Sequence, residues 1–120
     1  MERAEFENLV LRALESIPEG LRLYLDNVDI VVDDQPSRDQ LAGNSVGEGE
    51  LLLGLYEGVP LTERYDYGEV LPDKITLFQG SIEALGLSGE QMVSEIADTV
   101  VHEVAHHFGI DDDRLHALGY

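Results

Sequence analysis

The sequence has no cysteine, which excludes disulfide bonds, thiolate nucleophiles and zinc sites with cysteine ligands. No apolar run approaches the ~20 residues that cross a bilayer, and residues 1–10 are acidic and amphipathic rather than basic and then apolar. We therefore expect neither a signal peptide nor contact with a membrane. A chain without disulfides suits the reducing cytoplasm, which is the expected location.

Positive charge is also scarce, because 7 Lys and Arg stand against 25 Asp and Glu, giving a net charge of -18. Nucleic-acid binding needs clustered cations that release counterions from phosphates, so nucleic acid is excluded as an expected partner. The negative field favours cationic substrates over acidic ones. The alternative explanation is that a negative charge spread along the whole chain serves only to keep the protein soluble.

The 120 residues, 43% of them hydrophobic, correspond to one domain with a single core, covering residues 1–120. Apolar periodicity and turn residues predict mixed helix and strand. Helices are expected at residues 2–17, 81–85, 88–108 and 114–118, strands at 28–33, 51–56 and 74–78, and surface loops at 34–50 and 61–73.

The helix predicted at 88–108 carries the main chemical signal. It opens on Ser88-Gly89-Glu90-Gln91, which has the form of a capping box, and Gly109 supplies a left-handed stop. One broad apolar stripe is expected to face the core, made of Met92, Val93, Ile96, Ala97, Val100, Val101, Val104, Ala105 and Phe108. On the opposite side the helix carries His102-Glu103-Val104-Ala105-His106.

Two histidines four residues apart project from one helix face ~40° apart, close enough to share one tetrahedral metal ion. Glu103 lies beside the pair, placed to act on a metal-bound water rather than to ligate. The alternative is a solvated polar face without a function. If an aspartate completes the site, iron, cobalt, nickel and manganese can bind there as well as zinc.

Gly109 lets the chain reverse after the second histidine, so that a residue three positions later returns to the metal. That residue is Asp112, the preferred third ligand. Asp113 is instead expected to cap the last helix, and Asp111 to be a solvated turn residue. The remaining polar candidates are weaker: His107 is expected on the flank of the helix as a partly buried supporting residue, His116 reaches a metal only if the last helix folds back, and Thr99 either lines the cleft or is exposed.

The extended motif His-Glu-x-x-His-x-x-Gly-x-x-Asp, together with Tyr56-Glu57-Gly58-Val59-Pro60-Leu61-Thr62-Glu63-Arg64, Leu71-Pro72-Asp73-Lys74-Ile75-Thr76-Leu77-Phe78 and Asp112-Asp113-Arg114-Leu115, resembles the small bacterial zincin-like metallopeptidases. The resemblance implies an α+β minimal zincin-like fold, with a small mixed sheet packed against the metal-bearing helix. It also implies a zinc ion held by His102, His106 and Asp112, with Glu103 as general base.

The expected function is zinc-dependent hydrolysis of a peptide or protein substrate. Tyr65, Tyr67 and Arg64 are candidate donors to the developing oxyanion, and strand 74–78 is expected to offer its edge to an extended peptide. Two departures from metzincins matter: an aspartate replaces the third histidine, and no methionine follows Gly109. Competing hypotheses are a non-catalytic metal-binding or protein-interaction module on the same scaffold and an acidic mimic of nucleic acid.

Overall fold

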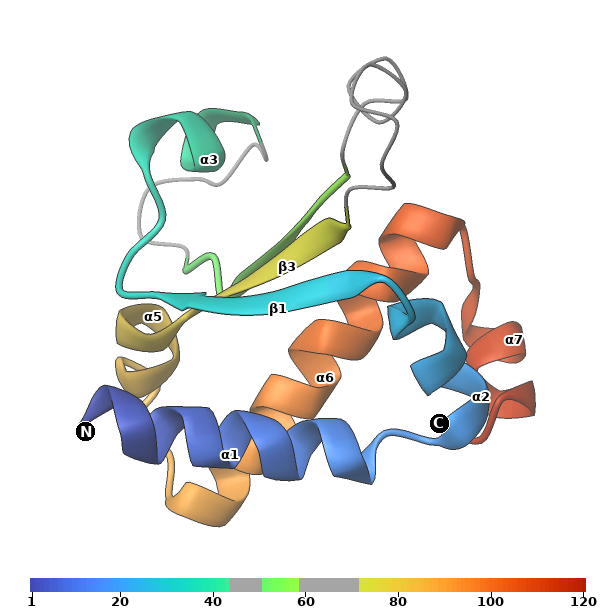
Figure 1. The fold of residues 1–120 in the computed structure, drawn as a ribbon, viewed down its shortest axis with the longest axis horizontal. Helices are drawn as coiled ribbons and strands as arrows, with labels where there is room; N and C mark the ends of the chain where they lie inside the picture. The colour runs from blue at the N-terminus through green and yellow to red at the C-terminus, as the bar shows by residue number, and fades with distance from the viewer. Residues whose placement is uncertain (44–50, 59–71) are drawn as a thin grey trace.

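The computed structural model describes residues 1–43, 51–58 and 72–120 of the chain. A three-stranded sheet lies across two long helices, α1 (Arg3–Ser16) and α6 (Gly89–Phe108), with shorter helices at both ends of the sheet (Figure 1). This mixed arrangement confirms the predicted α+β minimal zincin-like fold.

The sheet has the strand order β1-β3-β2. Strand β1 (Val28–Asp33) pairs in parallel with β3 (Asp73–Phe78), with Val28 opposite Asp73 and Asp33 opposite Phe78. Strand β2 (Gly54–Glu57) pairs antiparallel with the other side of β3. Strand β3 therefore has a neighbour on each side, and the prediction that it offers a free edge to a peptide is wrong. Among the strands of the described residues, β1 and β2 are the edge strands.

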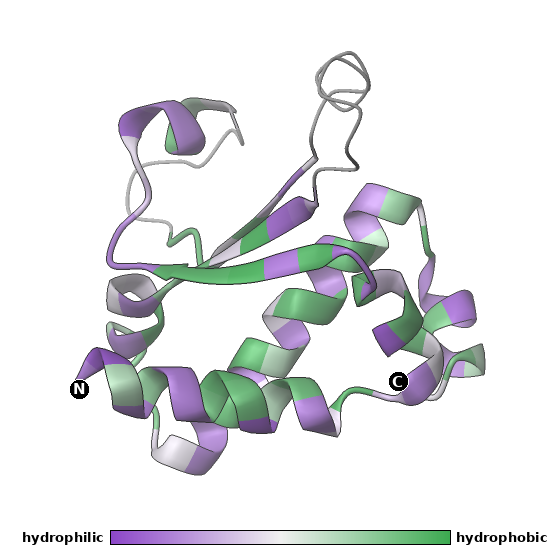
Figure 2. Ribbon diagram, viewed as in Figure 1, coloured by the Kyte–Doolittle hydropathy of each residue, from purple (hydrophilic) through white to green (hydrophobic). Residues whose placement is uncertain are grey.

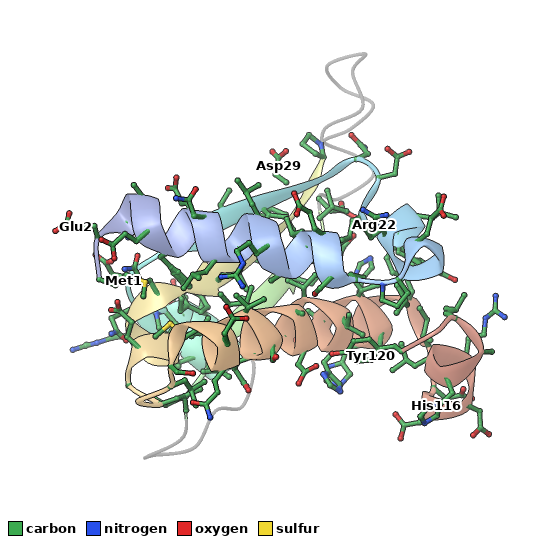
Figure 3. All side chains as sticks on the ribbon, turned by 90° about the horizontal axis from the view of Figure 1, so that it is seen from below. Met1, Glu2, Arg22, Asp29, His116 and Tyr120 are labelled. Carbon is green, nitrogen blue, oxygen red and sulfur yellow. The ribbon has the colours of Figure 1, made fainter. Side chains whose placement is uncertain are left out.

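The core lies between the sheet and the two long helices. In α1 the side chains of Phe6, Val10 and Ala13 are buried, and they recur at the helical spacing that was predicted. Figure 2 shows that α1 and α6 each carry hydrophobic and hydrophilic residues side by side. The two helices are in contact; they run side by side when seen from below in Figure 3 and cross obliquely in Figure 1. The apolar faces of the two helices thus cover each other and the sheet.

Helix α6 begins and ends as the sequence predicts. The Ser88 hydroxyl accepts a hydrogen bond from the Gln91 backbone N–H, and the Gln91 side chain accepts one from the Ser88 N–H. Gly109 ends the helix in the left-handed conformation, at φ 67°. Because the capping box and the glycine stop are local, they could be identified without knowledge of the tertiary fold.

Two further segments differ from the prediction. Residues 34–50 were expected to be a loop, but α3 (Arg38–Gly43) forms there, opened by reciprocal hydrogen bonds between Ser37 and Gln40. Residues 44–50 lie outside the described part of the chain. The strand expected at 51–56 begins at Gly54, and Leu51 is 48% exposed, so the apolar run 51–53 is not a buried strand.

The short elements complete the chain. They are α2 (Glu19–Arg22), the 3-10 helix η1 (Leu23–Leu25), α5 (Gln79–Glu83) and α7 (Asp112–Ala117). Helices α5 and α7 each begin two residues before the predicted bounds. Helix α7 follows the end of α6 that carries the histidine motif (Figure 1), and the candidate site lies at that end of α6.

Candidate metal and catalytic site

His102 and His106 lie on the exposed face of α6, one turn apart. The opposite face is buried against the core through residues that share a helical stripe: Met92, Ile96, Ala97, Val100, Val101, Val104 and Ala105. Phe108, which was predicted to end this stripe, is 45% exposed. The helix thus anchors two solvent-facing imidazoles on a rigid, buried support.

The His102 ring is held by the backbone of its own helix. Its Nδ1 atom lies 2.7 Å from the carbonyl oxygen of Asp98, one turn earlier. A carbonyl oxygen only accepts hydrogen bonds, so Nδ1 carries the proton in this contact and Nε2 keeps its lone pair. Metal-ligating histidines in proteins are commonly oriented in this way, through a donated hydrogen bond to a carbonyl.

Glu103 reaches sideways from α6 to the edge of the sheet. Its Oε1 atom accepts a hydrogen bond from the backbone N–H of Tyr56 in β2, with an N···O distance of 2.9 Å. Its Oε2 atom lies 3.9 Å from Nδ1 of His106. The Glu103 side chain is 20% exposed, whereas that of His106 is 80% exposed. One carboxylate oxygen is therefore held by the sheet edge, and the other is turned toward the histidine face.

A cleft of about 330 Å³ runs from this carboxylate toward the N-terminal half of α6. It lies between the start of β2 and the exposed face of the helix, and its lining residues are Leu52, Leu53, Gly54, Glu95, Asp98, Thr99, His102 and Glu103. Thr99 lines the cleft, one of the two positions expected for it, and its hydroxyl donates to the Glu95 carbonyl at 2.8 Å. Among these described lining residues there are three carboxylates and no lysine or arginine.

Asp112 stands at the first residue of α7 and is exposed. The cap of this helix is Asp111, whose Oδ1 atom accepts from the Arg114 N–H at 2.8 Å. The prediction that Asp113 caps the helix is therefore wrong, because Asp111 sits three residues before the amide that needs an acceptor. Within residues 1–43, 51–58 and 72–120, no three His, Asp or Glu side chains gather closely enough to hold a metal ion. The set of His102, His106 and Asp112 stays a prediction.

The other histidines take different positions. His107 stacks on the ring of Tyr56, with centroids 3.9 Å apart and an interplanar angle of 16°. His116 belongs to α7, the short helix that follows the end of α6 with the histidine motif, and it is exposed (Figure 3). The predicted oxyanion donors Arg64, Tyr65 and Tyr67 lie outside the described residues.

Two backbone groups that contact the site residues were not predicted from the sequence: the N–H of Tyr56 and the C=O of Asp98. Asp98 precedes His102 by four residues, so its carbonyl necessarily points toward the next turn, and this spacing was a usable signal. The Tyr56 contact joins residues 47 apart in sequence. No local pattern reports such a pairing.

A model of the family described as "Zincin-like metallopeptidase" matches residues 25–120, most of the chain. The chain belongs to this family. The matched range begins after α1 and α2 and includes the whole sheet and the helix with the histidine pair. No curated protein matches the chain.

A solved structure is similar over nearly its whole length. It is a conserved hypothetical protein from Thermo thermophilus, 27% identical, with a TM-score of 0.58 over 90% of this chain and 94% of that one. The two folds are thus alike along the length of the domain. Separately, none of the helices in the described residues combines the length and the hydropathy of a membrane span.

Proposed function

We propose that this member of the zincin-like family is a zinc-dependent peptidase. His102, His106 and Asp112 would hold the metal ion, and Glu103 would act as general base. The observation that carries the proposal is the position of Glu103, held by the edge of the sheet at one carboxylate oxygen and facing His106 with the other. We expect the protein to act in the cytoplasm, because a chain without cysteine suits a reducing compartment.

The donor chemistry of the exposed face fits zinc. The contact with the Asp98 carbonyl leaves Nε2 of His102 as the nitrogen with a free lone pair, and the His106 ring is exposed on the same face. Imidazole and carboxylate are common zinc ligands. When bound by three protein ligands, zinc keeps an open position for a water molecule, lowers its pKa toward ~7 and polarises a substrate carbonyl.

The two oxygens of Glu103 have different roles in this proposal. Oε1 is engaged by the Tyr56 N–H, which orients the carboxylate. Oε2 therefore receives the proton of the attacking water and then passes it to the nitrogen of the departing amine. In this way one carboxylate serves first as base and then as acid, without a second ionisable residue.

An extended substrate would lie along the outer edge of β2. The Phe78 N–H donates to the Leu53 carbonyl across the β2–β3 pair, so alternation along the strand turns the backbone groups of Gly54 and Tyr56 away from β3. The Tyr56 N–H is taken by Glu103, whereas no hydrogen bond within the described residues takes the outward N–H and C=O of Gly54, which we expect to pair with a peptide. Backbone groups of this kind pair with little regard to side chains, so we expect broad sequence tolerance along the edge.

Charge near the cleft supports a preference for cationic peptides. The cleft has a hydrophobic wall of Leu52 and Leu53 and an acidic wall that includes Glu95 and Asp98. A lysine or arginine side chain combines an aliphatic stem with a cationic tip, and it matches both walls. The substrate residue that flanks the scissile bond is therefore expected to be basic.

The test compares the parent protein, Glu103→Gln and the control Glu7→Gln, which makes the same charge change on the exposed face of α1. All three are loaded with zinc, analysed for metal content, and incubated with an unstructured peptide pool rich in Lys and Arg. Glu103→Gln is expected to keep its metal and its fold and to lose at least ~10²-fold in cleavage rate. The control keeps both metal and activity.

Two results contradict the proposal. A zinc-loaded parent protein that cleaves nothing in the pool favours the metal-binding or interaction module on the same scaffold. Glu103→Gln cleaving as fast as the parent removes the assigned base.

A further inference from the structure

Tyr56 touches α6 with both its backbone and its side chain. Its N–H donates to Oε1 of Glu103, and its ring stacks on His107, one turn further along the helix. Strand β2 is only four residues long and lies at the edge of the sheet. These two contacts therefore contribute to where the edge strand sits relative to the helix that carries the histidine motif.

The Tyr56 ring is held in place from other sides as well. Its hydroxyl donates to Oδ2 of Asp73 at 2.6 Å, at the start of β3. A short hydrogen bond to a carboxylate is among the stronger neutral-to-charged contacts. The ring of Phe108 meets Tyr56 edge-on, with centroids 6.0 Å apart, and is itself packed on Tyr24 at 5.1 Å. The ring is thus fixed to the sheet at its hydroxyl and to the helix at its face.

A glutamate side chain has several rotatable bonds, and one hydrogen bond orients it only when the donor is itself fixed. The donor here is a backbone N–H on a short edge strand. Its position relative to α6 depends on the stack with His107 and on the anchor at Asp73. A base that shifts by about 1 Å loses much of its catalytic effect.

We propose that Tyr56 and His107 are positioning residues for Glu103. The stacked rings, anchored by Asp73, keep the Tyr56 N–H at hydrogen-bonding distance from Oε1 and so aim Oε2 at the attacking water. The catalytic consequence rests on the proposed function. The positioning itself is a property of the folded chain and can be measured without turnover.

The test follows the backbone amide of Tyr56 by NMR in ¹⁵N-labelled protein. An amide that donates to a carboxylate resonates downfield, and its hydrogen exchange is slow. Glu103→Ala, which removes the acceptor, gives the reference without the bond. In His107→Ala the Tyr56 amide is expected to move toward that reference and to exchange at least ~10-fold faster than in the parent.

Three further variants make the comparison specific. His107→Phe keeps an aromatic ring for the stack and should restore the parent resonance. Tyr56→Phe keeps the stack but loses the bond to Asp73, so its amide should fall between the parent and the reference. His116→Ala removes an exposed histidine from α7 and should leave the amide unchanged.

The proposal is overturned if the Tyr56 amide in His107→Ala has the frequency and exchange rate of the parent. If His107→Ala does not fold, Tyr56→Phe decides: an amide indistinguishable from the parent overturns the proposal, and an intermediate one supports it. Where the parent cleaves peptides, His107→Ala should lower kcat with little change in KM and be rescued by His107→Phe. A parent that cleaves nothing contradicts the peptidase function but not the positioning, which the amide reports independently.

Discussion

Gly54 in β2 lies against Thr99 in α6 so closely that a Cβ added at residue 54 would come 2.6 Å from the Thr99 methyl carbon. Real Cβ atoms do not approach this distance, so only glycine lets the edge strand rest directly on the helix here. The contact lies at the cleft, within a few residues of Glu103 on α6 and of Tyr56 on β2. The spacing between strand and helix at the site therefore depends on a missing side chain.

Gly54→Ala is accordingly expected to push β2 away from α6 and to destabilise the fold by about 1–3 kcal/mol, the usual cost of overpacking. Urea unfolding measures the loss of stability. Thr99→Ser removes the obstructing methyl and keeps the hydroxyl, so the double variant should recover part of the loss. Equal stability of Gly54→Ala with and without Thr99→Ser would show that the methyl is not the obstacle.

The aspartates after Gly109 are expected to have different roles: Asp111 caps helix α7, and Asp112 binds the metal ion. Asp111→Ala removes the acceptor of the Arg114 N–H and should cost about 1 kcal/mol of stability, with metal content unchanged. Asp112→Ala should lower the affinity for zinc by orders of magnitude, with little change in the stability of the metal-free protein. Urea unfolding and metal retention after dialysis are measured for both, with Asp113→Ala as control. Retention of zinc by Asp112→Ala equal to that of the parent would remove it from the ligand set.

The cationic preference is tested by neutralising the cleft. The double variant Glu95→Gln, Asp98→Asn should cleave lysine-containing peptides more slowly relative to matched norleucine peptides, by at least ~5-fold, because two nearby carboxylates are lost. The control Asp29→Asn, Asp33→Asn makes the same change in charge on β1, at the opposite edge of the sheet. An equal loss of preference in the control would mean that the net charge of -18, rather than the cleft, selects the substrate.

Elements with a local signal could be predicted from the sequence. The helix from Gly89 to Phe108 follows from its apolar periodicity, its capping box and Gly109, and the same periodicity places the two histidines on the solvent face. The reciprocal hydrogen bonds between Ser37 and Gln40 form the same kind of capping box. Helix α3 could therefore also have been predicted from the sequence, although the segment was expected to be a loop.

Contacts between distant segments could not be predicted in this way. The parallel pairing of β1 with β3 joins residues 45 apart, such as Val28 and Asp73, and it places β3 in the middle of the sheet rather than at its edge. The hydrogen bond from Tyr56 to Glu103 depends on that strand order, because it needs β2 at the edge beside α6. Strand order is set by the packing of the whole chain, so the hydrophobic periodicity of a single segment does not report it.

The contact between α1 and α6 also bears on how the protein is made. Synthesis runs from the N-terminus, so Phe6, Val10 and Ala13 leave the ribosome long before the buried face of α6 that covers them. Strand β1 likewise cannot pair until β3 has been synthesised. Because both contacts need segments that are synthesised later, we expect the core to close only after residues 89–108 have emerged. The exposed histidine pair is consequently presented on a rigid helix only in the finished domain, so a partly made chain carries the motif without the geometry that hydrolysis would need.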